Sequence, residues 1–251
     1  MERKMQILWY DSLDSTNNEA VRRMETLDDL SVIAAVEQYS GRGQRGNVWH
    51  SAPGDNLTFS IVLKGDASLG SLPAASQFDI SRLSTLAVHE FIAEEGVEAK
   101  IKWPNDIYVG NRKICGMLIE NSLSGSRISW SIIGIGLNLN QEVFPPQLMN
   151  PTSLTVQNGM RYSPRASLKV ICGIFLKLLP LLNDIEGRKE LEKRNLEHLY
   201  RKGEWHEFRD LRTEKAFNGK IEGVTKDGLL EVINPAGQRK EFNFKEIGYI
   251  I

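Results

Sequence analysis

The segment Gly41-Arg42-Gly43-Gln44-Arg45-Gly46-Asn47-Val48-Trp49 decides between the folds that this sequence could adopt. Its three glycines let the backbone turn sharply and approach a ligand closely. Its two arginines provide planar, permanently charged donors that suit carboxylate or phosphate oxygens. Trp49 ends the segment with a flat ring on which another ring could stack. A solvated loop is the default interpretation of such a segment alone, so its meaning depends on the rest of the chain.

The residues around this loop exclude two nucleotide-binding folds. A dinucleotide-binding Gly-x-Gly-x-x-Gly segment follows a strand and opens a helix. Val32–Val36 predicts the strand, but Pro53-Gly54 and a second strand at Leu57–Leu63 follow the loop. No helix N-terminus is therefore available for a pyrophosphate. With Val48 the letters also match a protein-kinase glycine loop, but the sequence contains no V-A-I-K, H-R-D or D-F-G motif.

Composition indicates a globular protein with a substantial core, since 41% of the 251 residues are apolar. A formal net charge of −1 argues against bulk nucleic-acid binding. Cys115 and Cys172 lie in apolar surroundings without metal or redox spacing, so we expect buried thiols in a reducing compartment. We find neither a signal peptide nor an apolar run of membrane-spanning length. We therefore expect a cytoplasmic protein that binds neither nucleic acid nor membrane.

Hydrophobic periodicity predicts an α+β architecture with two domains. Short apolar or alternating runs predict strands, at Met5–Tyr10, Val32–Val36, Leu57–Leu63, Lys100–Trp103, Ile107–Val109, Ile114–Glu120 and Arg127–Ile135. Apolar stripes and capping signals predict helices, at Thr16–Leu27, Pro73–Glu95, Ser163–Asp184 and Lys189–Arg201. Gly110-Asn111 predicts a two-residue hairpin turn, and we expect His89 to be a surface residue.

The C-terminal part of the chain differs in composition from the rest. The change lies near Glu204–Leu211, and from about Arg212 onward turns separate four short strand-like segments. Such a pattern is typical of a small β-barrel. We therefore expect one domain at residues 1–207 and a second at residues 208–251.

Four polar segments fall at strand ends or hairpins, where one face of a sheet could gather them. They are Asp14–Asn17, Gln38 with the loop Gly41–Trp49, Lys102–Asp106 and Lys113–Gly116. Their cations and neutral donors suit an anionic ligand better than they suit hydrolysis. No Ser-His-Asp arrangement is present, and the four histidines lie outside these segments.

These segments resemble the motifs of the biotin–protein ligases, or biotin–[acetyl-CoA-carboxylase] ligases, which attach biotin to carboxylases. The similar motifs are Asp14–Asn17, Gly41–Trp49, Lys102–Asp106, Lys113–Glu120 and Gly134–Asn138. Five motifs in one order are far more specific than any one of them. The resemblance covers nearly the whole chain and implies an α+β fold. A mixed β-sheet flanked by helices, as in class II synthetases and biotin–lipoate ligases, would precede a small SH3-like β-barrel.

The resemblance also implies the reaction. Biotin would first be joined to the α-phosphate of ATP, giving biotinyl-5′-AMP, and would then pass to a lysine of a biotin carboxyl carrier protein. A unit-charge pair at ~4 Å is worth ~4 kcal/mol at an effective dielectric of ~20, so cations are needed between carboxylate and polyphosphate. We expect Mg²⁺ on the phosphates, with unassigned ligands. We also expect the monofunctional type, without an N-terminal DNA-binding domain, and leave open whether it forms a homodimer.

The family's functional residues map onto specific positions of this sequence. The implied catalytic residues are Lys113, which stabilises the charge of both transition states, Asp106, which helps to deprotonate the incoming amine, and Arg42. The implied biotin-binding residues are Ser15, Thr16, Asn17, Gln38, Gly41, Arg42, Gly43, Gln44, Lys113 and Gly116. Cys115 would line the pocket of the biotin ring together with Gly116. The implied nucleotide-binding residues are Arg45, Trp49, Lys102 and Asn138.

Some residues carry a second interpretation. Thr16 and Glu19 have the spacing of a helix capping box, Asp106 suits a turn cap after Pro104, and Asn138 fits a strand-end cap as well as an adenine contact. The sequence also departs from the family at Gln44, where many relatives have arginine, and at Asn47, where some have arginine.

Two other functions remain as alternatives. A lipoate or octanoate ligase of similar fold would need a long apolar acyl channel in place of the polar set. A non-enzymatic module that binds biotin or a nucleotide would not need Lys113 and Asp106 together.

Overall fold

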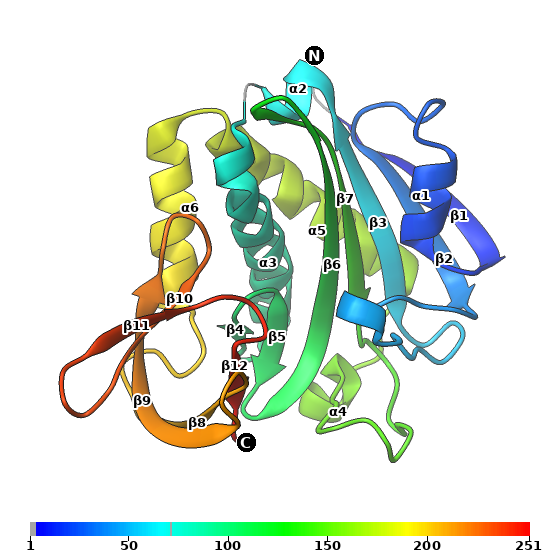
Figure 1. Cartoon of the computed structure of the whole chain (residues 1–251). Coiled ribbons are helices and arrows are strands. Elements are labelled where there is room, and N and C mark those ends of the chain that lie inside the picture. The colour runs from blue at the N-terminus through cyan, green and yellow to red at the C-terminus, as the bar shows by residue number, and fades with distance from the viewer. Residues whose placement is uncertain (1–3, 71) are drawn as a thin grey trace.

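Two β-sheets and the helices packed on the larger sheet make up this computed structural model, which describes residues 4–70 and 72–251 (Figure 1). The larger sheet has seven strands in the order β1-β2-β3-β7-β6-β5-β4. Its strands are β1 (Gln6–Leu13), β2 (Ser31–Gln38), β3 (Leu57–Lys64), β4 (Lys100–Lys102), β5 (Asp106–Val109), β6 (Arg112–Ser124) and β7 (Arg127–Leu137). β1 and β2 are parallel, and the other neighbours are antiparallel, so the sheet is mixed as expected.

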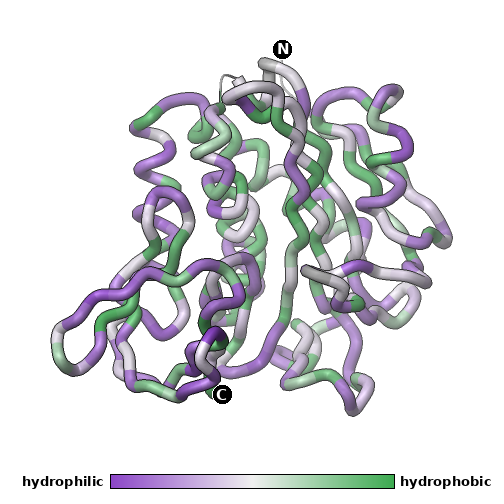
Figure 2. The backbone as a smooth tube through the Cα atoms, viewed as in Figure 1, coloured by the Kyte–Doolittle hydropathy of each residue, from purple (hydrophilic) through white to green (hydrophobic). Residues whose placement is uncertain are grey.

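Helices cover both faces of this sheet, and strand alternation decides which residues they meet. On β2, Val32 and Ala34 belong to the main core, whereas Ile33 and Ala35 face a smaller cluster that includes Ala20 of α1 (Thr16–Arg22). The main core holds α3 (Gln77–Glu94) and α5 (Pro164–Leu178), and α6 (Ile185–Glu197) packs on α3. Figure 2 shows hydrophobic residues along the central strands and nearby helices, whereas the outer loops are mostly hydrophilic. The short helices are α2 (Gly65–Leu69), α4 (Leu154–Asn158) and the 3₁₀ turns η1 (Gln44–Gly46), η2 (Ala74–Ser76) and η3 (Leu179–Leu182).

The second sheet is antiparallel and has the order β11-β10-β9-β8-β12. Its strands are β8 (Trp205–Asp210), β9 (Lys215–Val224), β10 (Leu230–Ile233), β11 (Arg239–Phe242) and β12 (Ile247–Tyr249). Phe208, Ile221 and Phe242 are fully buried in its core, and Trp103 reaches into the same cluster from the segment after β4. Sequence reasoning predicted four strands from about Arg212. β9 to β12 confirm these four strands, and the fifth strand of the sheet, β8, lies within the composition change near Glu204–Leu211.

The turn between β9 and β10 connects the second sheet to α3 and to the segment that follows β4. The Trp103 indole Nε1 donates to the Gly228 carbonyl over 2.9 Å, and the Arg82 guanidinium donates to the Thr225 carbonyl over 2.9 Å. Arg82 is buried with Asp79 at 2.7 Å. Gly228 has φ +90°, and a Cβ there would lie 2.7 Å from the Phe78 ring. The turn therefore needs glycine both for its backbone conformation and for its close approach to α3.

Three local predictions about helices were wrong. α1 ends at Arg22, since the chain turns there and returns Leu27 to the apolar cluster of α1. Thr16 is not the N-cap: Ser15 holds that position, and the amide of Thr16 donates to Gln38 Oε1 over 2.7 Å. α5 ends at Leu178 and gives way to the 3₁₀ turn η3, after which α6 begins at Ile185.

His89 is buried, with 6% of its surface exposed, so the surface prediction was wrong. An apolar stripe implies one covered face, but α3 is covered by α5 and α6 as well as by the sheet. The imidazole Nε2 lies 3.1 Å from the Ala99 carbonyl, and the ring stacks on His198 at 4.1 Å. Burial, His198 and Lys100 lower the pKa of His89 to about 4, against a smaller upward effect of the Ala99 carbonyl.

This burial predicts a pH-dependent stability. The folded pKa of His89 is below the unfolded value, so the unfolded state binds more protons between about pH 6.5 and pH 4. As the pH is lowered from about 6.5 to about 4, protonation of this group should therefore reduce the free energy of unfolding by about 2–3 kcal/mol. Urea denaturation as a function of pH measures this. His89→Gln should make the free energy of unfolding depend less steeply on pH. The dependence that remains should come from His198, because burial also lowers the pKa of His198. The exposed-residue control His50→Gln should keep the parent profile, and an equally steep profile in His89→Gln would contradict the assignment.

Candidate functional site

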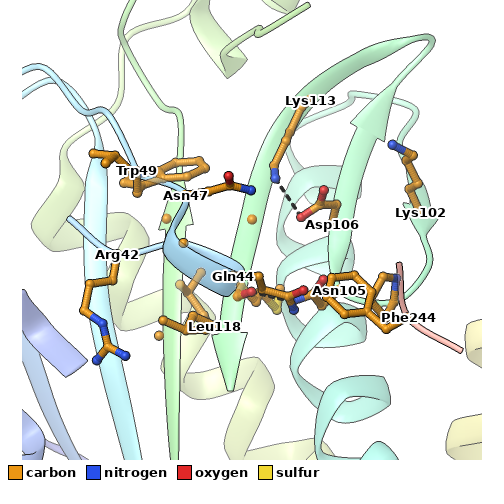
Figure 3. A pocket seen from close by; sticks show the side chains of 18 of the residues that line it. Arg42, Gln44, Asn47, Trp49, Lys102, Asn105, Asp106, Lys113, Leu118 and Phe244 are labelled. Carbon is orange, nitrogen blue, oxygen red and sulfur yellow. Dashed lines mark hydrogen bonds and ion pairs between the residues drawn. The ribbon is translucent and has the colours of Figure 1, made fainter. Parts of the chain in front are cut away.

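A pocket of about 320 Å³ is lined by residues of both sheets, on the face of the large sheet that α1 covers (Figure 3). This volume lies at the lower end of the range for small-molecule sites. The pocket gathers twelve of the residues that the sequence proposed for the site: Ser15, Thr16, Asn17, Gln38, Arg42, Gly43, Gln44, Trp49, Lys102, Asp106, Lys113 and Gly116. Four segments that are far apart in the chain therefore meet at one place.

Of the other residues that the sequence singled out, Gly41, Asn138 and Cys115 do not line the pocket. Gly41 supports the loop, since a Cβ there would lie 2.5 Å from the Trp49 carbonyl oxygen. Asn138 is buried at the end of β7, where its Nδ2 donates to the Thr152 carbonyl over 2.9 Å. The Arg45 side chain is outside the described part of the structure. Cys115 was expected to line the pocket together with Gly116. It is instead fully buried in the main core, because neighbouring residues of a strand point to opposite faces.

The floor of the pocket depends on glycines that face each other across two strands. Gly116 of β6 pairs with Gly136 of β7, and the Trp49 ring lies against both. A Cβ on Gly136 would lie 2.2 Å from the indole, and one on Gly134 would lie 2.2 Å from Asn17 Oδ1. Neither distance is sterically possible, so larger residues at these positions would displace Trp49 or Asn17.

Hydroxyl and amide groups form a connected network at the N-terminus of α1. The Ser60 hydroxyl lies 2.7 Å from Thr16 Oγ1 and 2.6 Å from Asn17 Oδ1, while Asn17 Nδ2 donates to Glu120 Oε2 over 2.7 Å. Sequence reasoning missed the supporting role of Ser60. A serine within the apolar run Leu57–Leu63 was the available signal, since a buried strand position rarely holds an unpaired hydroxyl.

Two of the pocket's cations are held in ion pairs that are open to solvent. Arg42 contacts Glu120 at 2.8 Å, and Lys113 contacts Asp106 at 2.8 Å, the pair marked by the dashed line in Figure 3. Side-chain exposure is 40% for Arg42 and 31% for Lys113. Pairs of this exposure contribute at most about 1 kcal/mol. An anionic ligand can therefore take over either cation at little cost.

The segment Lys102–Asp106 is fixed at nearly every residue. Trp103 is anchored in the second sheet, the Pro104 carbonyl accepts from Ser81 Oγ over 3.0 Å, and Asn105 donates to the Met117 carbonyl. Asp106 and its contact with Lys113 are therefore carried by a segment with little freedom to move.

The second sheet and the turns beside its strands supply lining residues that the sequence did not predict. They are Leu211, Phe244, Lys245, Ile247, Gly248 and Tyr249. These residues have no local motif, and the pattern of the tail indicated only a separate small domain. Their contribution depends on the docking of the second sheet, which no local pattern encodes.

Residues 9–138 match the model of the Biotin/lipoate A/B protein ligase family. The chain belongs to this family. The family assignment inferred from the five motifs is confirmed. In sequence the chain is similar to the bifunctional ligase/repressor BirA of Bacillus subtilis (strain 168), with 30% identity over 94% of this chain and 72% of that protein. It is also similar to the biotin--[acetyl-CoA-carboxylase] ligase of Paracoccus denitrificans, with 29% identity over 90% of this chain and 93% of that protein.

Solved structures of the family share the fold. The biotin protein ligase from Aquifex aeolicus in complex with biotin and ATP superposes with a TM-score of 0.79 and 24% identity, over 97% of each chain. The biotin protein ligase from Leishmania major in complex with biotin superposes with a TM-score of 0.65 and 20% identity, over 96% of this chain and 99% of that chain. The expected α+β fold, a mixed sheet flanked by helices with a smaller C-terminal sheet, is thereby confirmed.

The glycine floor gives a testable prediction. Gly136→Ala places a Cβ within 2.2–2.6 Å of three indole atoms, so the Trp49 ring must leave its position. We expect the affinity for a ligand that stacks a ring on Trp49 to fall about tenfold or more, the range for one lost stacking contact. Isothermal titration calorimetry measures the affinity. The control is Gly173→Ala, whose Cβ would meet nothing within 4 Å, and equal affinities in the two variants would contradict a role of the floor.

Proposed function

We propose that the chain is a biotin–protein ligase. It activates biotin with ATP to give biotinyl-5′-AMP and pyrophosphate, and transfers the biotinyl group to a lysine of a biotin carboxyl carrier protein. The observation that carries the proposal is the Lys113–Asp106 pair at 2.8 Å, inside a pocket that also holds Trp49 and Arg42, in a chain of this family. Its relatives named as biotin ligases support the same substrate.

In the first step, a biotin carboxylate oxygen forms a bond to the α-phosphorus of ATP, and the bond to the pyrophosphate oxygen breaks. Negative charge is thus concentrated on two reactants that repel each other. Lys113 leaves Asp106 and lies between carboxylate and α-phosphate, where its charge stabilises the transition state. Arg42, released from Glu120, adds a second cation. Neither movement leaves a carboxylate in a dry interior, because Asp106 and Glu120 are both partly exposed.

Mg²⁺ would neutralise part of the triphosphate charge in this step. No group of three or more metal-ligating His, Cys, Asp or Glu side chains occurs among the described residues. Asp106 is the one carboxylate in the described lining of the pocket. This donor set fits a Mg²⁺ ion held mainly by phosphate oxygens and water, as is usual for nucleotide-bound magnesium.

In the second step, the amine of the carrier lysine attacks the carbonyl carbon of biotinyl-5′-AMP. An amide bond forms, AMP leaves, and the amine gives up a proton. Asp106 can accept that proton or orient the amine once Lys113 has turned toward the intermediate. The amine needs such help because its unperturbed pKa of ~10.4 keeps it mostly charged at neutral pH.

The two ends of the pocket suit the two substrates. Ser15, Thr16, Asn17 and Gln38 offer hydroxyls and amides to the ureido group of biotin. Trp49 offers its ring to adenine. Asn138 Oδ1 has no donor among the described residues, but it is buried outside the lining of the pocket, so we assign the adenine contact to Trp49 alone. On the pocket floor, Gly116 has no side chain that would keep a ligand from the backbone.

The alternatives are less well supported. A lipoate or octanoate ligase needs a long apolar channel, whereas this pocket ends in the polar network around Asn17. A simple binding module would leave the Lys113–Asp106 pair unexplained.

We keep residues 1–207 as the catalytic domain and 208–251 as the C-terminal domain. No described helix is both long and apolar enough to cross a membrane. We place the reaction, with its carrier protein, in the cytoplasm, where the buried free thiols of Cys115 and Cys172 would stay reduced.

Exchange of labelled pyrophosphate into ATP tests this function directly. Exchange that requires biotin is the expected result, with lipoate and octanoate inactive at the same concentration. Exchange with lipoate alone would establish the alternative ligase. Binding of biotin and ATP without any exchange would establish the binding module and overturn the proposal.

Lys113→Ala should lower adenylate formation by ~10²–10³, the typical loss of one charge-stabilising donor at a transition state. The fold should survive, because the Lys113 side chain is partly exposed. Single-turnover formation of biotinyl-5′-AMP measures the effect. The matched control is Lys177→Ala, a change at an exposed residue of α5, and this variant should react at the parent rate. Adenylation at the parent rate in both variants would remove Lys113 from the mechanism.

Asp106→Asn should slow transfer to the carrier more than adenylation, because only the transfer step must deprotonate an amine. Rapid-quench measurements of each half-reaction separate the two effects. Equal slowing of the two halves would instead indicate that Asp106 positions Lys113 or a metal ion.

A further inference from the structure

The amine of Lys102 is held differently from the cationic groups of Arg42 and Lys113, which pair with carboxylates. Its Nζ donates to the Tyr108 hydroxyl over 3.0 Å and lies 4.4 Å from the centre of the Tyr108 ring. On another side it lies 4.8 Å from the centre of the Tyr249 ring. No carboxylate of the described residues lies within ion-pair distance of Lys102, and Figure 3 shows Asp106 turned toward Lys113 instead.

The two rings come from different sheets. Tyr108 belongs to β5 of the large sheet, and Tyr249 ends β12 of the second sheet. Tyr200 lies against both rings, at 5.5 Å from Tyr108 and 6.0 Å from Tyr249. Its hydroxyl donates to Asn111 Oδ1 over 2.5 Å, which fixes the ring. The Lys102 amine is therefore enclosed by a tyrosine cluster that closes only when the second sheet is docked.

Aromatic rings hold a cation without neutralising it. A carboxylate would cancel the charge of Lys102, whereas a ring face attracts the ammonium and leaves its full charge for a ligand. Lys102 and Tyr249 both line the pocket. The chemistry of this arrangement suits a polyanion, because Lys113 and Arg42 must break an ion pair to bind one, and Lys102 need not.

We propose that Tyr249, with Tyr108, positions Lys102 as a preformed cation for the phosphate groups of the nucleotide, so that the last strand of the chain belongs to the nucleotide subsite. The choice of a nucleotide rests on the proposed function, whereas the arrangement of the tyrosines does not. Tyr249 is a positioning residue in this proposal, because it acts through Lys102.

The titration of Lys102 agrees with this arrangement. Burial lowers the pKa of Lys102 to about 8, with further lowering by Lys113 and Arg201 and an opposing effect of Asp106. At a pKa of about 8 the ammonium stays mostly charged at neutral pH, and a further lowering of the pKa would begin to remove its charge. The ring of Tyr249 and a bound phosphate both favour the charged form, so removing the ring should lower the pKa further.

Tyr249→Leu and Tyr249→Phe separate the ring from mere packing. Leucine keeps an apolar group beside Lys102 but removes the π face. Phenylalanine keeps the ring, and its loss of the hydroxyl should cost little, because the Tyr249 hydroxyl is buried without a partner among the described residues. We expect the ATP dissociation constant to rise about five- to thirty-fold in Tyr249→Leu, the factor for 1–2 kcal/mol of cation–π attraction, and to stay near the parent value in Tyr249→Phe. The KM for biotin should not change.

The pKa of Lys102 provides a readout that does not depend on activity. The rate of acetylation of Lys102 by limiting acetic anhydride, followed by mass spectrometry from pH 6 to pH 10, gives its apparent pKa, with exposed Lys177 as the internal reference. Tyr249→Leu should lower the pKa of Lys102, and Tyr249→Phe should leave it unchanged. In a Lys102→Met background, Tyr249→Leu should have no further effect on the dissociation constant of ATP.

The proposal is overturned if Tyr249→Leu binds ATP as the parent does, or if Tyr249→Phe is as weak as Tyr249→Leu. It is also overturned if Tyr249→Leu weakens ATP binding equally with and without Lys102, since the effect would then come from packing alone. ATP binding is measured by calorimetry and needs no turnover. If the variants show the expected changes in ATP binding but the parent protein shows no biotin-dependent exchange, the ligase function is therefore refuted and the nucleotide subsite is supported.

Discussion

The packing of Trp103 into the core of the second sheet is the contact on which the rest of the site depends. The indole is buried and donates to the Gly228 carbonyl over 2.9 Å. Because Trp103 is fixed, its neighbours in the segment Lys102–Asp106 are fixed as well. Lys102 meets the ring of Tyr249, and Asp106 meets Lys113 at 2.8 Å. A single short segment thereby aligns charges from one sheet with a wall supplied by the other.

The charges of the pocket differ in how readily they can be used. Arg42 and Lys113 are held by carboxylates in partly exposed pairs, which are weak enough to exchange for an anionic ligand. Lys102 is held by rings and keeps its charge. The glycines of β6 and β7 leave room for Trp49 on the floor below. Together these features provide cations, a stacking surface and polar amide groups in one pocket, as activation of a carboxylate by a nucleotide requires.

Much of this site could be predicted from the sequence, because its motifs are local. Strand alternation, the Gly110-Asn111 hairpin turn between β5 and β6, and the polar segments at strand ends all depend on neighbouring residues. What could not be predicted depends on tertiary packing. Gln38 caps a helix that begins 22 residues earlier, and His89 is buried because α5 and α6 cover α3. The contribution of Tyr249 follows from docking of the second sheet, for which the sequence carries no local signal.

Amide hydrogen–deuterium exchange, with and without biotin and ATP, tests most directly whether both sheets build the site. If they do, ligands should slow exchange in the loop at residues 41–49 and also in two parts of the second sheet. Those parts are the turn at residues 225–228, which is anchored to Trp103 and Arg82, and the C-terminal residues 244–249. The outer hairpin at residues 234–238 serves as the internal control and should not change. Protection confined to residues of the large sheet would contradict the account.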